Sequence, residues 1–217
     1  VYLGRHGKRL DDSLISTIAE DSSCEVALFL QLVLDELRLH ADHYSLERRA
    51  RELLATREAG VLFRRVLEEM DTDFSRVAPG LATRAAGLIS VSRQGLTYND
   101  LRGLLIARQS RQSGEVEARL NDITMAPLWA RLEVFARMLD GRLLFSHAIL
   151  TQALREDPEA PSWREVLIDA NSGDNGDALA ERTHQLVSLD DRGRLVELLG
   201  DPKRVIGLLG TASPLLL

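Results

Sequence analysis

The sequence predicts a mainly α fold, in which a helical bundle is followed by a winged-helix domain and a further helical hairpin. Leucine dominates the apolar residues and aromatic residues make up only 5%, which suits packed helices better than a sheet. Apolar residues recur every three to four positions through most of the chain. The segment 95–154 combines two helices, a short strand and a last helix, which is the outline of a winged helix.

Composition limits the classes of function. The chain has 217 residues, 45% of them hydrophobic and 28% charged, enough to bury a core. The net charge of −6 argues against a nucleic-acid partner, because duplex-binding domains usually carry a basic surface. Cys24 is the only cysteine, which excludes an internal disulfide and favours a reducing compartment. We expect a cytoplasmic location without membrane association, since no apolar run approaches about 20 residues. Both chain ends are expected to be cut from something longer.

Residues 1–78 are predicted to form a first helical domain. Its helices are expected to start at Asp11 or Asp12, and to cover 25–40, 45–55 and the residues after Glu58. The second of these helices is expected to be buried on most sides. It contains LVLDE (32–36), which copies the magnesium-binding pattern of P-loop ATPases, but its period is helical, so we expect its two acids to emerge into water.

The third helix should begin at Ser45 as an N-cap. It is amphipathic, and its arginines Arg48, Arg49 and Arg51 are expected in solvent.

Residues 79–157 are predicted to form the winged-helix domain. After Pro79-Gly80, a small-residue helix is expected over 81–91, and Thr97 is a good N-cap for the next helix. Pro127 is predicted to start a helix that continues to Leu139. Gly141 should end it, with a strand over 142–146 and a last helix from His147 onward.

Residues 158–217 are predicted to begin a second helical domain. A helix over 162–170 should turn Trp163 and Leu167 inward. The segment 171–176 is a strong loop signal. Helices are expected over 178–189 and 192–210, the latter interrupted at Gly200-Asp201-Pro202.

No motif in the sequence predicts catalysis, and no metal ligands are predicted. Gly7-Lys8 is not a phosphate loop, because Tyr2 stands where that motif needs glycine and Arg9 where it needs Ser or Thr. His40 and His43 have a spacing that is weak for a metal site. A helix over 127–139 would be the DNA-reading element, but its first turn is apolar and its cations are Arg131 and Arg137.

Three stretches of the sequence together resemble one protein family. They are VYLGRHGKRLDDSLI followed by EVALFLQLVLDELR, then GLTYNDLRGLL with PLWARLEVFARMLDGRLLFSHAILTQAL, and last LAERTHQLVSLDDRGRLVELLGDP. In this order they resemble the part of STAND-class P-loop NTPases that follows the NTPase core. The nearest group is the NACHT proteins related to nephrocystin and to telomerase-associated and WD-repeat NACHT proteins.

The resemblance implies a nucleotide switch. His147, in Phe145-Ser146-His147, would touch the β-phosphate of ADP, and Ala27 would lie on the adenine side, where the family usually has proline. Ala148 stands where an acid often follows the histidine. ADP or ATP, with Mg²⁺, would be held only together with an upstream NTPase domain, and this chain alone would hold no cofactor.

The implied partners are that NTPase domain, a downstream repeat domain and further copies of the whole protein, in signalling or defence. From the residues alone, a histidine at a helix start either faces an anion site or caps its own junction. The alternative function is a non-enzymatic helical adaptor or a winged-helix transcription regulator.

Overall fold

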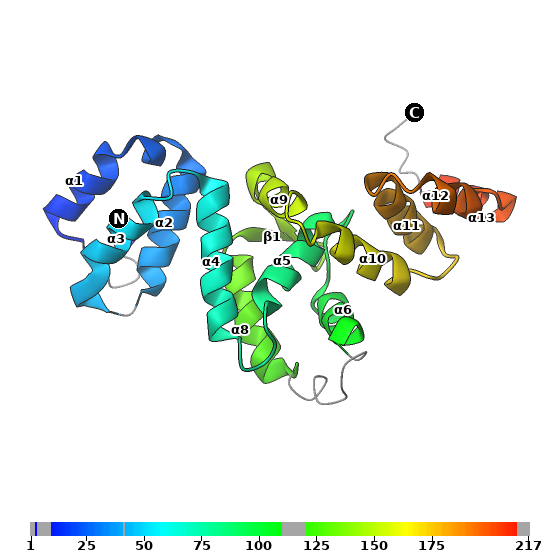
Figure 1. The fold of residues 1–217 in the computed structure, drawn as a ribbon, viewed down its shortest axis with the longest axis horizontal. Helices are drawn as coiled ribbons and strands as arrows, with labels where there is room; N and C mark the ends of the chain where they lie inside the picture. Colours follow the sequence, from blue (N-terminus) through cyan, green and yellow to red (C-terminus); the bar gives the residue numbers. More distant parts are fainter. Residues whose placement is uncertain (1–2, 4–9, 41, 110–119, 212–217) are drawn as a thin grey trace.

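The computed structural model describes residues 3, 10–40, 42–109 and 120–211, and confirms that the chain is mainly α. The helices form an elongated arrangement, with α1–α3 at one end, α4, α5, α8 and α9 in the middle, and α11–α13 at the other end (Figure 1). Within the described residues, no helix is both long and apolar enough to cross a membrane. The elements are α1 (Asp12–Glu20), η2 (Ser22–Glu25), α2 (Ala27–Leu39), η3 (His43–Ser45), α3 (Leu46–Leu54), α4 (Ala59–Asp73), α5 (Leu81–Val91), α6 (Tyr98–Gln109), α8 (Asp122–Glu133), β1 (Ala136–Leu139), β2 (Arg142–Phe145), α9 (Ala148–Arg155), α10 (Ala160–Ala170), α11 (Gly176–Ser188), α12 (Arg192–Leu199) and α13 (Pro202–Thr211).

Side-chain caps set two helix starts where the sequence places them. Asp11 Oδ1 accepts a hydrogen bond of 2.7 Å from the Leu14 N–H and starts α1. Thr97 Oγ1 accepts from the Asp100 N–H at 3.1 Å, while Asp100 Oδ2 accepts from the Thr97 N–H at 3.2 Å. This reciprocal pair is a capping box, which satisfies two donors at the start of α6.

The expectation that the acids of α2 emerge into water was wrong. Asp35 is 3% exposed and Glu36 is 5% exposed. Arg49, expected in solvent, instead points inward from α3. Its Nη2 lies 2.9 Å from Glu36 Oε2, and it also pairs with Glu69 of α4. Because α2 packs against both α3 and α4, its polar end is covered, and a buried carboxylate there needs a cation from a neighbouring helix.

Burial and pairing act in opposite directions on these two carboxyl groups. Burial raises the pKa of Glu36, and its hydrogen bond from Arg49 offsets only part of that rise. Burial would also raise the pKa of Glu69, but hydrogen bonds from Arg49 and Arg65 outweigh it and hold that pKa below its usual value. Ser45 precedes α3 without capping it, and its hydroxyl bonds to Asp42 instead.

The middle of the chain has the order of a winged helix: α5, a single paired residue, α6, α8, and the hairpin β1–β2. The paired residue is Leu96, which forms an antiparallel bridge to Leu143 of β2. In the hairpin, Ala136 pairs with Phe145 and Leu139 pairs with Arg142. The strand predicted over 142–146 is therefore confirmed.

The predicted helix from Pro127 to Leu139 was wrong at both ends. α8 begins five residues earlier, where Asn121 Oδ1 accepts from the Thr124 N–H, and Pro127 lies inside the helix. α8 ends at Glu133, and 136–139 form β1. The cause is the hairpin turn, in which Asp140 and Gly141 both have positive φ (50° and 74°), as a two-residue turn of the I′ type requires.

One hydrophobic core passes through the predicted domain boundary at residue 78. It extends from Leu14 in α1 to Leu167 in α10, without a gap between α4 and α5. A second, smaller cluster begins next to it and consists of Ile168, Leu179, Leu186 and Leu198. The division into domains 1–78, 79–157 and 158–217 therefore stays a prediction, because the core does not stop at residue 78.

α10 joins the winged helix to the C-terminal helices. Its Trp163 is fully buried, as expected, and lies against Gly87 of α5. A Cβ atom at Gly87 would lie 2.4 Å from the Trp163 ring. α5 and α10 therefore approach each other as closely as they do only because residue 87 is glycine.

Gly87→Ala should lower the free energy of unfolding by about 1–3 kcal/mol, the usual cost of overpacking a core. Gly103→Ala is the matched control, since nothing lies within 4 Å of a Cβ atom there, and it should stabilise α6 by about 0.5–1 kcal/mol. Urea unfolding measures both. Equal effects of the two substitutions would contradict this packing.

Arg49→Met should lower the free energy of unfolding by about 3–5 kcal/mol near pH 7, because it leaves the Glu36 charge buried and unpaired. The pKa of Glu36 is raised in the folded state, so this loss grows as pH rises through that pKa and shrinks on acidification toward about pH 5. Urea unfolding at both pH values checks it. Arg51→Met, which removes only an exposed pair with Glu47, should cost at most about 0.5 kcal/mol. A loss of equal size at both pH values would refute the assignment to Glu36.

Candidate functional site

The two residues singled out by the sequence each lie at the start of a helix. His147 is the exposed residue before α9, with extended backbone angles (φ −128°, ψ 132°). Its side chain makes no capping hydrogen bond with α9, so capping its own junction is not its role in this structure. Ala27 is the first residue of α2 and is also exposed.

Residues at or near these two helix starts line the same two hollows. A cavity of about 180 Å³ is lined by Leu28 and Gln31 of α2 together with Ser146 and His147. A neighbouring groove of about 410 Å³ brings Val26, the residue before Ala27, together with Ile149 of α9 and residues of α4. His147 and the neighbours of Ala27 therefore belong to one surface, although Ala27 itself lines neither hollow.

Two features of this surface favour an anion and one opposes it, since Asp35 of α2 lines the same cavity as His147. Within the described part of the chain, neither α2 nor α9 has a side-chain cap or an acidic residue in its first turn. The first N–H groups of a helix have no partner inside it and carry a partial positive charge. Two such helix ends, beside an exposed imidazole, suit a phosphate group.

The wing hairpin fixes His147 in place. Phe63 of α4 is fully buried and packs edge-on against Phe135 and Phe145, with ring centroids 5.2 Å and 5.4 Å apart. The Ser146 N–H donates to the Phe135 carbonyl at 3.3 Å. Ser146, the residue immediately before His147, is therefore held by its hydrogen bond to Phe135 and by the packing of its neighbour Phe145.

The winged helix does not present a typical DNA-reading surface. The exposed residues of α8 are mostly apolar or acidic, and Ile123 is 84% exposed. Arg131, one of the two cations of the expected reading helix, pairs with Asp73 of α4 at 2.6 Å. Arg137 lies on β1 instead of a helix. Major-groove reading needs Arg, Asn or Gln on the exposed face of the helix.

Other candidates from the sequence gain no support. No group of three or more His, Cys, Asp or Glu residues among the described ones could hold a metal ion. The His40 ring bonds to Ser45 Oγ at 2.8 Å, while the His43 side chain lies outside what the structure describes. The Gly7-Lys8 pair also lies outside the described residues.

Comparisons with known proteins give a partial likeness. No family model matches the chain, and no solved structure matches it. A TPR repeat-containing protein of Dictyostelium discoideum is 29% identical over 108 residues, which cover half of this chain and 6% of that protein. The chain therefore matches one small part of a much longer relative.

Proposed function

We propose that this chain is the regulatory helical and winged-helix part of a STAND-class, NACHT-type signalling or defence protein. In this role it clamps ADP bound to an upstream NTPase domain and controls opening and oligomerisation. One observation carries the proposal: the exposed His147, at the uncapped start of α9, lines one cavity with Leu28 and Gln31 of α2, whose start also has no side-chain cap.

His147 and the helix starts of this surface would supply hydrogen-bond donors to a nucleotide phosphate, against the opposing charge of Asp35 in the same cavity. Bound ADP would supply a diphosphate, and His147 would donate a ring N–H to it. The first N–H groups of α9 would add their partial positive charge. Ala148 and Ala27 have only methyl side chains, so at these two positions the chain would act through its backbone alone.

The clamp would work by shifting a population between closed and open states. While ADP is bound, the hydrogen bond from His147 favours the closed state, in which α9 and α2 rest against the NTPase domain. Exchange for ATP removes that preference, and the open state presents surfaces for further copies of the protein. Hydrolysis belongs to the NTPase domain, and the proposed location is the cytoplasm.

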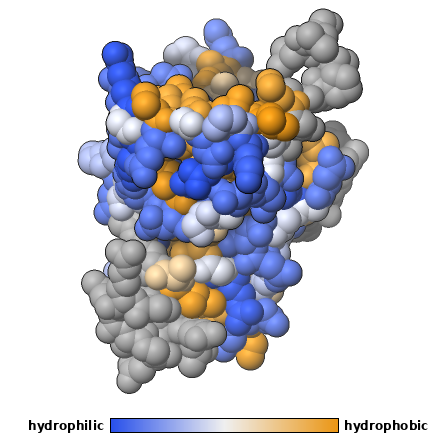
Figure 2. All heavy atoms as spheres, turned by 90° about the vertical axis from the view of Figure 1, so that its right-hand side faces the viewer, coloured by the Kyte–Doolittle hydropathy of each residue, from blue (hydrophilic) through white to orange (hydrophobic). Residues whose placement is uncertain are grey.

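The C-terminal helices support the proposal of a downstream repeat domain. Their shared core is small, and Figure 2, which faces this end of the molecule, shows hydrophobic residues gathered along its upper part. The Dictyostelium relative is named as a TPR repeat-containing protein. TPR repeats stack so that each unit covers the apolar face of its neighbour. The apolar side chains exposed on these helices are Val187 (60%), Val196 (71%), Ile206 (69%) and Leu209 (70%).

His147→Ala, in the protein that includes the NTPase domain, should accelerate ADP dissociation by about tenfold to a hundredfold. This corresponds to the roughly 1.5–3 kcal/mol that a hydrogen bond to a charged group contributes. Stopped-flow release of a fluorescent ADP measures the rate. The melting temperature should not change, because the His147 side chain caps nothing.

Ser188→Ala is the control for this experiment. Ser188 is exposed on α11, outside both hollows of the His147 surface, and its hydroxyl donates to the His184 carbonyl, so its removal should leave ADP release unchanged. An unchanged release rate in His147→Ala, together with a lower melting temperature, would show a structural histidine and favour the adaptor or regulator alternative.

A further inference from the structure

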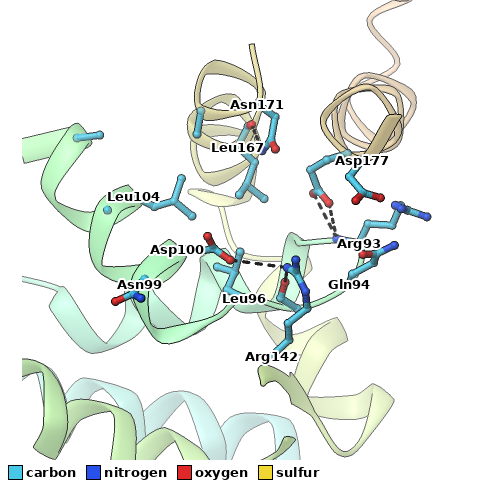
Figure 3. A pocket seen from close by; sticks show the side chains of 15 residues that line it. Arg93, Gln94, Leu96, Asn99, Asp100, Leu104, Arg142, Leu167, Asn171 and Asp177 are labelled. Atoms are coloured by element: carbon cyan, nitrogen blue, oxygen red, sulfur yellow. Dashed lines mark hydrogen bonds and ion pairs between the residues drawn. The ribbon is translucent and has the colours of Figure 1, made fainter. Parts of the chain in front are cut away.

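A third hollow lies between the winged helix and the C-terminal helices. It is an open cleft of about 400 Å³. Figure 3 shows Leu104 and Asp100 on one wall, Leu167 and Asn171 above them, and Asp177 with Arg93 at the far side. The walls belong to α6 and β2 on one side and to α10 and α11 on the other.

The cleft combines an apolar wall with polar groups, as small-molecule sites usually do. Leu96, Leu104 and Leu167 form the apolar part, and each is at most 7% exposed. The polar side is rich in acids, because the described lining residues include the carboxylates of Asp100, Asp177 and Glu181.

Of the two cations among the described lining residues, Arg142 is paired with Asp100 inside the cleft and Arg93 faces away. Arg142 Nη1 donates to the Gly95 carbonyl at 3.2 Å and lies 3.7 Å from Asp100 Oδ2. The Arg93 guanidinium points away from the leucine wall (Figure 3), and no ion pair within the described residues joins it to a carboxylate. Arg93 contributes its backbone N–H, which donates to both oxygens of Glu181 at 3.2 Å.

Two of these carboxylates lie one helical turn apart. Asp177 and Glu181 are at positions i and i+4 of α11, so they share one face of the helix and repel each other. Glu181 Oε1 also accepts from Gln185 Nε2 at 2.6 Å, whereas Oε2 receives only the Arg93 N–H. Asp177 has no hydrogen-bond or ion-pair partner among the described residues. The pair therefore keeps free acceptor capacity on the cleft side.

We propose that this cleft binds a primary amine or guanidinium group on a short apolar stem. The cation would lie between Asp177 and Glu181, and the stem would lie against Leu104 and Leu167. A free alkyl amine and a lysine side chain of a partner share this chemistry. The proposal does not depend on the nucleotide clamp.

A ligand in the cleft would affect how firmly the C-terminal helices are attached to the winged helix. Glu181 belongs to a buried polar network in which Gln185, 0% exposed, donates to the Val91 carbonyl at 2.8 Å and accepts from Arg164 at 2.8 Å. This network attaches α11 to α5 and α10. A cation held by Glu181, with its stem on α6, would tie the C-terminal helices more firmly to the winged helix.

Protein-observed NMR titration of the chain with three probes of one shape tests the proposal. The probes are 3-methylbutylamine, 3-methylbutan-1-ol and 3-methylbutanoate, which are cationic, neutral and anionic. We expect saturable shifts of the Gly95, Leu104 and Leu167 amides with the amine, at a Kd of about 1 mM for so small a ligand. The alcohol and the carboxylate should bind at least about tenfold more weakly.

The variant Asp177→Asn should weaken amine binding by about fivefold to tenfold. Asp12→Asn is the matched control, because Asp12 is also an exposed acid in the first turn of its helix, far from the cleft. Three results would each overturn the proposal: no saturable shift with the amine, equal binding of the alcohol, or equal weakening by Asp12→Asn.

A further titration distinguishes the two sources of the cation. Its probe is the capped peptide acetyl-Leu-Lys-Leu-amide. If it binds at least about tenfold more tightly than the amine and with the same dependence on Asp177, the occupant is a lysine of a partner. If only the amine binds, the occupant is a free small molecule. Peptide binding that is insensitive to Asp177→Asn would contradict the proposed position of the cation between Asp177 and Glu181.

Discussion

The contact of Phe63 with the wing is the constraint on which the candidate site depends. Its ring, on α4, packs edge-on against Phe135 and Phe145, which flank the hairpin. Aromatic pairs of this geometry contribute beyond the area that they bury. The contact holds the β1–β2 hairpin on α4, which also packs against α2 and α9. It thereby places His147 beside the start of α2.

The chain has two joints of different chemistry. The joint between the first helices and the winged helix is apolar and continuous, and Phe63 is part of it. The joint to the C-terminal helices combines the tight Trp163–Gly87 contact with a buried network of Arg164, Gln185 and Glu181. Apolar packing tolerates little displacement, whereas hydrogen-bonded groups at the edge of a cleft can exchange partners. We infer that, within the second joint, the attachment of α11 rather than the Trp163–Gly87 contact is the part open to regulation.

Local signals were predictable from the sequence and tertiary ones were not. The cap at Asp11, the capping box at Thr97 and the helix start after His147 each depend on residues close in the chain. The inward turn of Arg49 depends on Glu69, twenty residues away, which no local pattern reveals. Asp140-Gly141 is a sequence signal for a two-residue hairpin turn, and this signal alone places a strand, β1, directly before it. The acidic cleft needs α6 and α11 together, although the Asp177–Glu181 spacing alone would have placed both carboxylates on one helix face.

We propose that this chain distinguishes the nucleotide state of an NTPase domain through the surface around His147. Calorimetric titration of the chain with the separately produced NTPase domain tests it most directly, in ADP, in a non-hydrolysable ATP analogue and without nucleotide. We expect the ADP-loaded domain to bind at least about tenfold more tightly than the other two forms, since only a difference in affinity shifts a population. Equal affinity for all three forms would contradict it.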